Sequence, residues 1–312
     1  MHRFAMRVSR DRAFVPAIPM VVVGALRAGG SGKTSVTLEL ARIFLGRGLR
    51  VAILAYRMGR GRRGADPDFS EVGDGDDWRL FSEEAVMLRR DTGARVFATR
   101  NRAYAWKRLH QYDVHGGRSF DLILSDDGFQ DPRLDGAFRI LLEAPGERPG
   151  LFDLLPGGHF RETRACRRRA DLILQGPYQE GDLGEAREGA SAYRFVRRIF
   201  LPQGLDRGRR WIAASSLGEN SGFLACLRGA GINPVAVLEG RNHAAPPLGI
   251  IRSLEARFPG AGILCTRKDG VRWEGPDSPL PDFRVVDQEI RLETEIMDRI
   301  SAYFRRFRGR AS

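Results

Sequence analysis

The sequence predicts an α/β protein in which helices cover both faces of a mostly parallel sheet, with a second, smaller α/β lobe. In the first half of the chain, short apolar segments typical of strands alternate with helix-like segments. A glycine-rich loop joins the first strand to the first helix, and an aspartate pair ends a later strand. The length of 312 residues suits two domains or one large one.

The glycine-rich loop joins an expected strand at 19–24 to an expected helix at 36–49. Strand, glycine loop, Lys-Thr and helix is the order that binds nucleoside triphosphates, because backbone N–H groups and the helix N-terminus face the phosphates. Lys33 would contact the outer phosphates, and Thr34 would bind Mg²⁺. The expected nucleotide-binding residues are Arg27, Ala28, Gly29, Gly30, Ser31, Gly32, Lys33 and Thr34. The fold is therefore expected to be P-loop NTPase-like.

Two features bear on this loop in opposite ways. Arg27 stands where the strict motif has glycine, so an ordinary glycine-rich turn is the alternative. The chain has only three lysines (Lys33, Lys107 and Lys268) among its 51 basic residues, and one of them lies in this loop. A compact ammonium suits phosphate, which favours the nucleotide interpretation.

The remaining elements of the first half follow at short intervals. We expect further strands at 50–55, 94–99, 120–125, 138–142 and 170–174. We expect helices at 78–90 and 102–112, and a loop rich in Gly, Arg and Asp at 59–75.

Composition changes at 179–190, which is acidic and poor in large apolar residues. We therefore expect a nucleotide-binding domain at 1–182 and a smaller α/β domain at 183–312, with a strand-like linker near 191–200. The smaller domain should hold strands at 211–215, 234–238 and 262–266, and helices at 221–229 and 292–307.

Charge and cysteine content limit the partners and the compartment. The net charge of +12 favours an anionic partner, although an arginine-rich composition alone would give the same charge. The three cysteines are far apart in sequence, which is typical of reduced thiols in a cytosolic protein. No apolar run approaches the ~20 residues of a membrane-spanning helix. The first 14 residues lack the apolar centre of a signal peptide and are either a basic amphipathic segment or a frayed terminus.

Asp126 and Asp127 follow an apolar strand, at the edge where parallel sheets bind ligands. A carboxylate there could hold Mg²⁺ beside the phosphate loop. The alternative is an exposed Asp-Asp-Gly turn, and the upstream Lys33 loop favours the metal role.

Glu83 and Glu84 lie near the start of an expected helix. One of them could act as general base toward a hydroxyl nucleophile. Acidic residues are also common in a first helical turn, where they complement the helix dipole. Further along, Arg161 could clamp a phosphate, and Lys268 could face a ligand or pair with Asp269.

Four segments together resemble the tetraacyldisaccharide 4′-kinase family of lipid A synthesis. They are the loop at 24–34, Asp-Asp-Gly-Phe-Gln at 126–130, Leu-Leu-Pro-Gly-Gly-His-Phe-Arg-Glu at 154–162 and Thr-Arg-Lys-Asp-Gly-Val-Arg at 266–272. The family's Gly-Asp-Glu-Pro aligns with 82–85, which makes the proposed base Glu83, and its Asp-His pair aligns with Asn242 and His243. The pattern at 55–59 keeps only its last glycine, so the acceptor side departs more than the nucleotide side.

The resemblance implies a Mg·ATP-dependent kinase that phosphorylates the 4′-hydroxyl of a tetraacylated disaccharide 1-phosphate. It implies two α/β lobes joined by strand-like linkers, with the active site in the cleft. The catalytic residues would be Lys33, Glu83, Asp127 and His243; the metal ligands Thr34, Asp126 and Asp127; and the substrate contacts Arg102, Gln130 and Arg161. We expect a monomer in peripheral contact with the cytoplasmic face of the inner membrane, and no nucleic-acid partner.

Two other classes of protein stay open from the sequence. A GTPase-like regulatory protein would need Asn-Lys-x-Asp, and 266–269 lacks the Asn. A degenerate relative that binds nucleotide or lipid without turnover would also fit the altered acceptor-side motifs.

Overall fold

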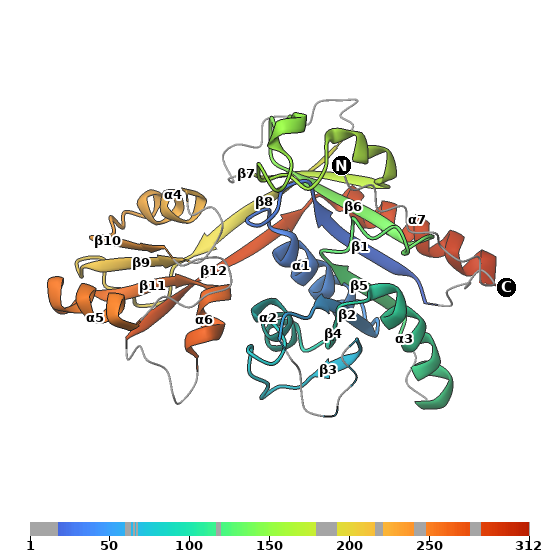
Figure 1. The fold of residues 1–312 in the computed structure, drawn as a ribbon, viewed down its shortest axis with the longest axis horizontal. Coiled ribbons are helices and arrows are strands. Elements are labelled where there is room, and N and C mark those ends of the chain that lie inside the picture. The colour runs from blue at the N-terminus through green and yellow to red at the C-terminus, as the bar shows by residue number, and fades with distance from the viewer. Residues whose placement is uncertain are drawn as a thin grey trace.

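The computed structural model describes residues 18–59, 64, 66, 68–116, 120–178, 192–215, 221–239, 248–274 and 282–311. Within these ranges one twelve-stranded sheet has the order β10-β9-β11-β12-β8-β7-β6-β1-β5-β2-β4-β3 (Figure 1). Neighbouring strands are parallel, except that β3 pairs antiparallel with β4 and β8 pairs antiparallel with β12.

The elements divide between a larger and a smaller half of the sheet. The larger half holds β1 (Met20–Ala25), β2 (Val51–Tyr56), β3 (Ser70–Val72), β4 (Arg95–Thr99), β5 (Leu122–Asp126), β6 (Phe138–Glu143) and β7 (Leu172–Tyr178), with α1 (Lys33–Gly46), α2 (Glu83–Thr92) and α3 (Arg102–Gly116). The smaller half holds β9 (Trp211–Ser215), β10 (Ala236–Glu239) and β11 (Gly262–Thr266), with α4 (Ser221–Gly229), α5 (Leu248–Arg257) and α6 (Arg267–Trp273). β8 (Tyr193–Phe200) and β12 (Phe283–Leu292) connect the halves, and α7 (Thr294–Ala311) follows β12.

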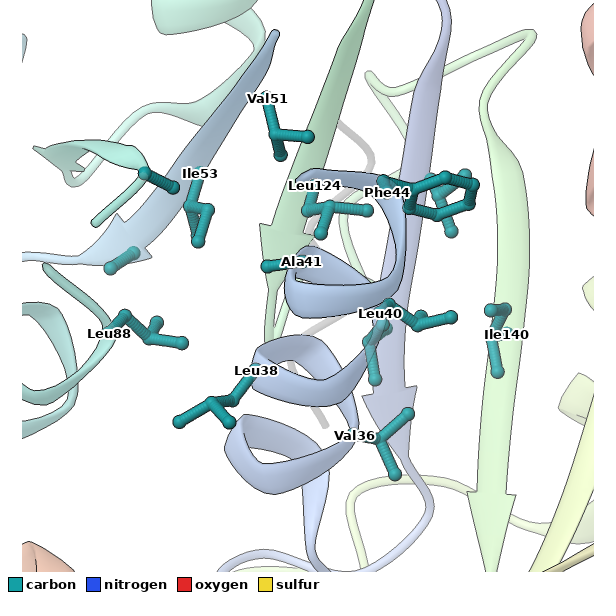
Figure 2. Packing of buried hydrophobic residues seen from close by; sticks show 14 of the residues in the cluster. Val36, Leu38, Leu40, Ala41, Phe44, Val51, Ile53, Leu88, Leu124 and Ile140 are labelled. Atoms are coloured by element: carbon teal, nitrogen blue, oxygen red, sulfur yellow. The ribbon is translucent and has the colours of Figure 1, made fainter. Parts of the chain in front are cut away.

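Alternate residues of the central strands face opposite sides of the sheet. Val21 and Val23 of β1 pack in a core with α1, α2 and α7, whereas Met20 and Val22 pack in a second core with α3. On α1, residues four positions apart form one apolar stripe against β1, β5 and β6 (Figure 2). This two-sided packing confirms the predicted α/β fold class.

Helix α7 returns the chain to the larger half. The Tyr303 hydroxyl accepts from the Met20 amide at 3.4 Å and donates to the Gly136 carbonyl at 3.0 Å. The Phe304 ring lies 5.7 Å from the Phe44 ring of α1. The domain boundary at residue 182 stays a prediction, and α7 packs on the half that precedes it.

The element bounds differ from the sequence prediction at several places. Helix α2 begins at Glu83 rather than at 78, because the Ser82 hydroxyl accepts the Ala85 amide and caps the helix there. The short edge strand β3 lies inside the predicted loop, and β12, α5 and α6 were not predicted.

Candidate nucleotide site between the two halves of the sheet

The loop that follows β1 lines a cavity of about 820 Å³ together with residues of both halves of the sheet. Gly29, Gly30 and Gly32 have φ values of 76°, 65° and 79°, which residues with a Cβ rarely adopt. Helix α1 begins directly after Gly32, so its N-terminus lies at the cavity. All eight predicted nucleotide-binding residues, 27–34, line this cavity. The arrangement can bind an anion through backbone N–H groups.

Lys33 lies between the loop and the aspartate pair. Its Nζ donates to Ser31 Oγ at 3.0 Å and lies 3.8 Å from Asp127 Oδ1. Burial lowers the pKa of Lys33 from its ordinary value, and the carboxylates of Asp127 and Asp126 oppose that shift. The side chain is placed to meet a second anion, such as a phosphate.

Asp126 ends β5 with its carboxylate held by two hydroxyls of α1. Thr34 Oγ1 donates to Oδ2 at 2.9 Å, and Thr37 Oγ1 donates to Oδ1 at 3.0 Å. Burial raises the pKa of Asp126 to about 6, and the adjacent Asp127 adds to the shift. Sequence reasoning missed Thr37, although its position one helical turn after Thr34 was a usable signal.

Asp127 adopts a left-handed backbone conformation with φ 55°. Its two carboxylate oxygens accept from Arg161 Nη1 and Nη2 at 2.6 and 2.7 Å. Burial would raise the pKa of Asp127, but Lys33 and Arg161 outweigh burial and hold it below the usual range. This carboxylate is therefore ionised at neutral pH.

Arg161 reaches the site from the segment between β6 and β7. Its amide donates to the Leu26 carbonyl at 2.8 Å, which fixes the segment against the phosphate loop. Gln130 supports it from behind, because Gln130 Oε1 accepts from Arg161 at 3.3 Å while Nε2 donates to the Ala25 carbonyl at 3.0 Å. Arg161 lines the cavity and Gln130 does not. Gln130 therefore helps to position Arg161, and its role as a substrate contact stays a prediction.

Arg102 also lines the cavity, from the first residue of α3. Its Nη2 donates to the Asp126 carbonyl at 2.6 Å, and its guanidinium lies 5.8 Å from the centre of the Tyr56 ring. Burial lowers the pKa of Arg102 from its ordinary value. It therefore supports the strand end that carries the aspartate pair, besides facing the cavity.

The two glutamates of α2 lie in different surroundings. Glu83 is 2% exposed, and its Oε1 accepts from Arg272 Nε at 2.8 Å. Glu84 lines the cavity, and its Oε1 lies 2.6 Å from Lys268 Nζ. Successive helical residues point about 100° apart, and of these two glutamates Glu84 lines the cavity whereas Glu83 does not. This placement favours Glu84 over Glu83 as a group that could meet a ligand, and the role of Glu83 as the base stays a prediction.

His243, the predicted partner of Glu83, lies outside the described residues. The cavity is also lined by apolar side chains of β8, β12 and α4, namely Phe195, Ile199, Val286, Ile290 and Phe223. Sequence reasoning missed them, because apolar residues in strands carry no sign of a ligand.

A glycine loop at a helix N-terminus, facing acidic residues at the end of a neighbouring parallel strand, defines a P-loop nucleotide-binding protein. Comparison of the chain with known protein families identifies its family. The model of the tetraacyldisaccharide-1-P 4′-kinase family (LpxK) matches residues 1–305, and this chain belongs to that family. The predicted family resemblance is thereby confirmed.

Individual members of this family are also similar to this chain. The tetraacyldisaccharide 4′-kinase of Gluconacetobacter diazotrophicus is 33% identical over 85% of this chain and 79% of its own. That of Geobacter sulfurreducens is 30% identical over 81% and 74%. The solved structure of LpxK from Aquifex aeolicus in complex with ATP matches with a TM-score of 0.65 at 25% identity, over 92% of this chain and 89% of that chain.

Proposed function

We propose that this protein transfers the γ-phosphate of ATP to the 4′-hydroxyl of a tetraacylated disaccharide 1-phosphate in lipid A biosynthesis. Family membership supports the substrate class. The observation that carries the proposal is the meeting of loop and carboxylates in one cavity. There Thr34 Oγ1 lies 2.9 Å from Asp126 Oδ2 and Lys33 Nζ lies 3.8 Å from Asp127 Oδ1. Phosphoryl transfer needs mainly positioning and charge neutralisation, which these groups can supply.

The residues at this point fit Mg²⁺. The Thr34 hydroxyl and the carboxylates of Asp126 and Asp127 are hard oxygen donors, which Mg²⁺ prefers. Mg²⁺ usually keeps several waters and takes phosphate oxygens as further ligands, so a few protein oxygens are enough to hold it. When bound, the ion would neutralise phosphate charge. Lys33 and the loop amides would hold the β- and γ-phosphates.

We propose Glu84 as the base. The acceptor oxygen forms a bond to the γ-phosphorus, the bond from that phosphorus to the β–γ bridging oxygen breaks, and ADP leaves with the electron pair. The hydroxyl proton passes to the Glu84 carboxylate, which lines the cavity. Arg27, Arg102 and Arg161 line the same cavity and are the proposed contacts for phosphate oxygens.

The GTPase alternative receives no support from the 266–269 segment. Asp269 is 1% exposed, and its carboxylate accepts from the Thr266 hydroxyl at 2.6 Å. Arg272 Nη1 lies 3.4 Å from the other oxygen. An aspartate enclosed in this way has no free edge for a guanine ring.

The described ranges include no helix that is both long and apolar enough to span a bilayer. We propose a peripheral contact with the cytoplasmic face of the inner membrane, where the lipid acceptor would be met, and a monomeric state without nucleic acid.

The test is product analysis with two acceptors. Purified protein, Mg²⁺ and γ-labelled ATP are incubated with the disaccharide 1-phosphate, and separately with the same lipid already phosphorylated at the 4′-position. The expected result is a bis-phosphorylated product from the first acceptor and no labelled lipid from the second. Equal labelling of both, or of neither, would contradict the proposal.

A further inference from the structure

The segment between β6 and β7 exposes an apolar tip. Leu151, Phe152 and Leu155 are 76%, 97% and 53% exposed, and all three lie within the short stretch 151–155. In Figure 1 the segment, drawn in green, lies at the upper edge of the view. Isolated exposed apolar residues are common on proteins, but a cluster of them indicates a contact surface.

Several backbone groups of this tip are hydrogen-bonded within the segment. The Leu155 amide donates to the Phe160 carbonyl at 2.7 Å, and the Phe160 amide donates to the Asp153 carbonyl at 3.0 Å. The Asp153 carboxylate accepts from the Gly150 amide at 2.8 Å, so the one acid at the tip is also bonded. Internal hydrogen bonding of this kind is what a segment needs in order to enter an apolar phase.

The base of the segment is joined to the phosphate loop. The Ala28 amide donates to the His159 carbonyl, and the Arg161 amide donates to the Leu26 carbonyl, both at 2.8 Å. Arg161 then reaches Asp127. The apolar tip is therefore held at a fixed offset from the cavity.

Positively charged residues precede and follow the tip in the sequence. Arg148 lies before it and Arg168 after it, and both side chains are exposed. The whole chain carries a net charge of +12. Apolar side chains between exposed arginines match the interface of a bilayer with anionic headgroups, where rings enter and cations remain at the surface.

We propose that the tip formed by residues 150–156 docks the protein on an anionic lipid bilayer, with Leu151, Phe152 and Leu155 entering the interface. The inference rests on the proposed function for its reason, because a lipid acceptor resides in a membrane. The attachment of the tip to the phosphate loop would then set the height of the cavity above the bilayer.

The test compares two triple variants. The first carries Leu151→Ser, Phe152→Ser and Leu155→Ser. The control carries Val235→Ser, Val237→Ser and Ile250→Ser, at apolar positions 36%, 43% and 47% exposed on the smaller half. Binding is measured by co-sedimentation with vesicles of about one part phosphatidylglycerol to three parts phosphatidylcholine. We expect the tip variant to lose binding roughly tenfold or more, and the control to bind like the wild type.

Activity measurements separate this inference from the proposed function. Kinase activity of the tip variant should persist with acceptor in detergent micelles and fall with acceptor in vesicles. If the wild type phosphorylates no acceptor at all, the vesicle binding still decides the docking surface.

Three results would overturn the inference. The first is equal vesicle binding by the tip variant and the wild type. The second is a wild-type dimer that the tip variant converts to a monomer, which would assign the patch to a second copy of the chain. The third is loss of activity in micelles with unchanged vesicle binding, which would assign the tip to the acyl chains of the acceptor.

Discussion

Glu83 and Glu84 are adjacent in α2 but have different surroundings. Glu83 is hydrogen-bonded to Arg272, whereas Glu84 lines the cavity and forms an ion pair with Lys268. The sequence alone does not reveal which of them turns inward, because that depends on where α2 begins and on what α6 presents to it. Ser82 sets the first of these conditions by capping the helix.

The two glutamates can be distinguished by matched substitutions. We expect Glu84→Gln to lower kcat by roughly 10²-fold or more, because it removes the proposed proton acceptor. Glu83→Gln should change kcat only a few-fold and should instead lower the melting temperature, because it weakens a buried ion pair. Steady-state kinetics and thermal unfolding check both. A large kcat loss confined to Glu83→Gln would return the base to the position that the family alignment assigns.

The buried Asp126 predicts a pH dependence in the metal-free protein. Its pKa of about 6 in the folded state lies above the ordinary value of 3.8, so the folded state binds the proton more tightly than the unfolded state. The contribution of Asp126 to the free energy of unfolding is therefore fully present below pH ~4, and roughly 3 kcal/mol of it is lost as the pH rises through 6.

Asp126→Asn should remove this dependence, because the amide carries no charge. The measurement is urea unfolding in the presence of a chelator at pH 5 and pH 7.5. The free energy of unfolding of the variant, relative to that of the wild type, should be higher at pH 7.5 than at pH 5. A constant difference between the two proteins would contradict the pKa shift.

At the scale of elements, the site depends on how closely β1 and the 126–130 turn approach each other. The Gly128 amide donates to the Val23 carbonyl at 3.2 Å, so the turn packs on the end of β1. A Cβ built on Gly24 would lie 2.2 Å from Phe129 Cβ. This contact locks the turn that carries Asp127.

Gly24→Ala should therefore lower stability by about 1–3 kcal/mol and reduce nucleotide binding, since the turn must shift to make room. Gly46→Ala is the control, because nothing lies within 4 Å of its added Cβ at the end of α1, and it should leave stability unchanged or slightly raised. Urea unfolding and nucleotide titration measure the two effects. Normal nucleotide affinity in Gly24→Ala would show that the turn tolerates displacement.

At the scale of the whole molecule, the two halves of the sheet meet across α2 and α6. Besides the Glu83 and Glu84 pairs, Arg267 Nη2 lies 2.5 Å from Asp91 Oδ1 and Arg90 Nη1 lies 3.3 Å from Glu274 Oε2. These contacts join residues 176 and 184 positions apart in the chain. They place Lys268 of the smaller half at the cavity of the larger one.

Some features of this molecule can be predicted from its sequence, and others cannot. The fold class, the phosphate loop and the aspartate pair follow from local patterns, because glycine conformation and strand-end acids are set within a few residues. Strand β12 was missed, since its alternation of charged and apolar residues over 283–292 borders the helix pattern of α7. The orientation of Glu84 and the positioning role of Gln130 depend on contacts between distant segments, which no local pattern records.

Lys33 and the aspartate pair are proposed to form one phosphate-transfer site, and substitution of the lysine tests this proposal. Transfer of labelled γ-phosphate to the disaccharide lipid is measured for Lys33→Met and for Lys107→Met, whose side chain is exposed on α3. We expect a loss of about 10³-fold for Lys33→Met and near-normal transfer for Lys107→Met. Near-normal transfer by a folded Lys33→Met protein would contradict it.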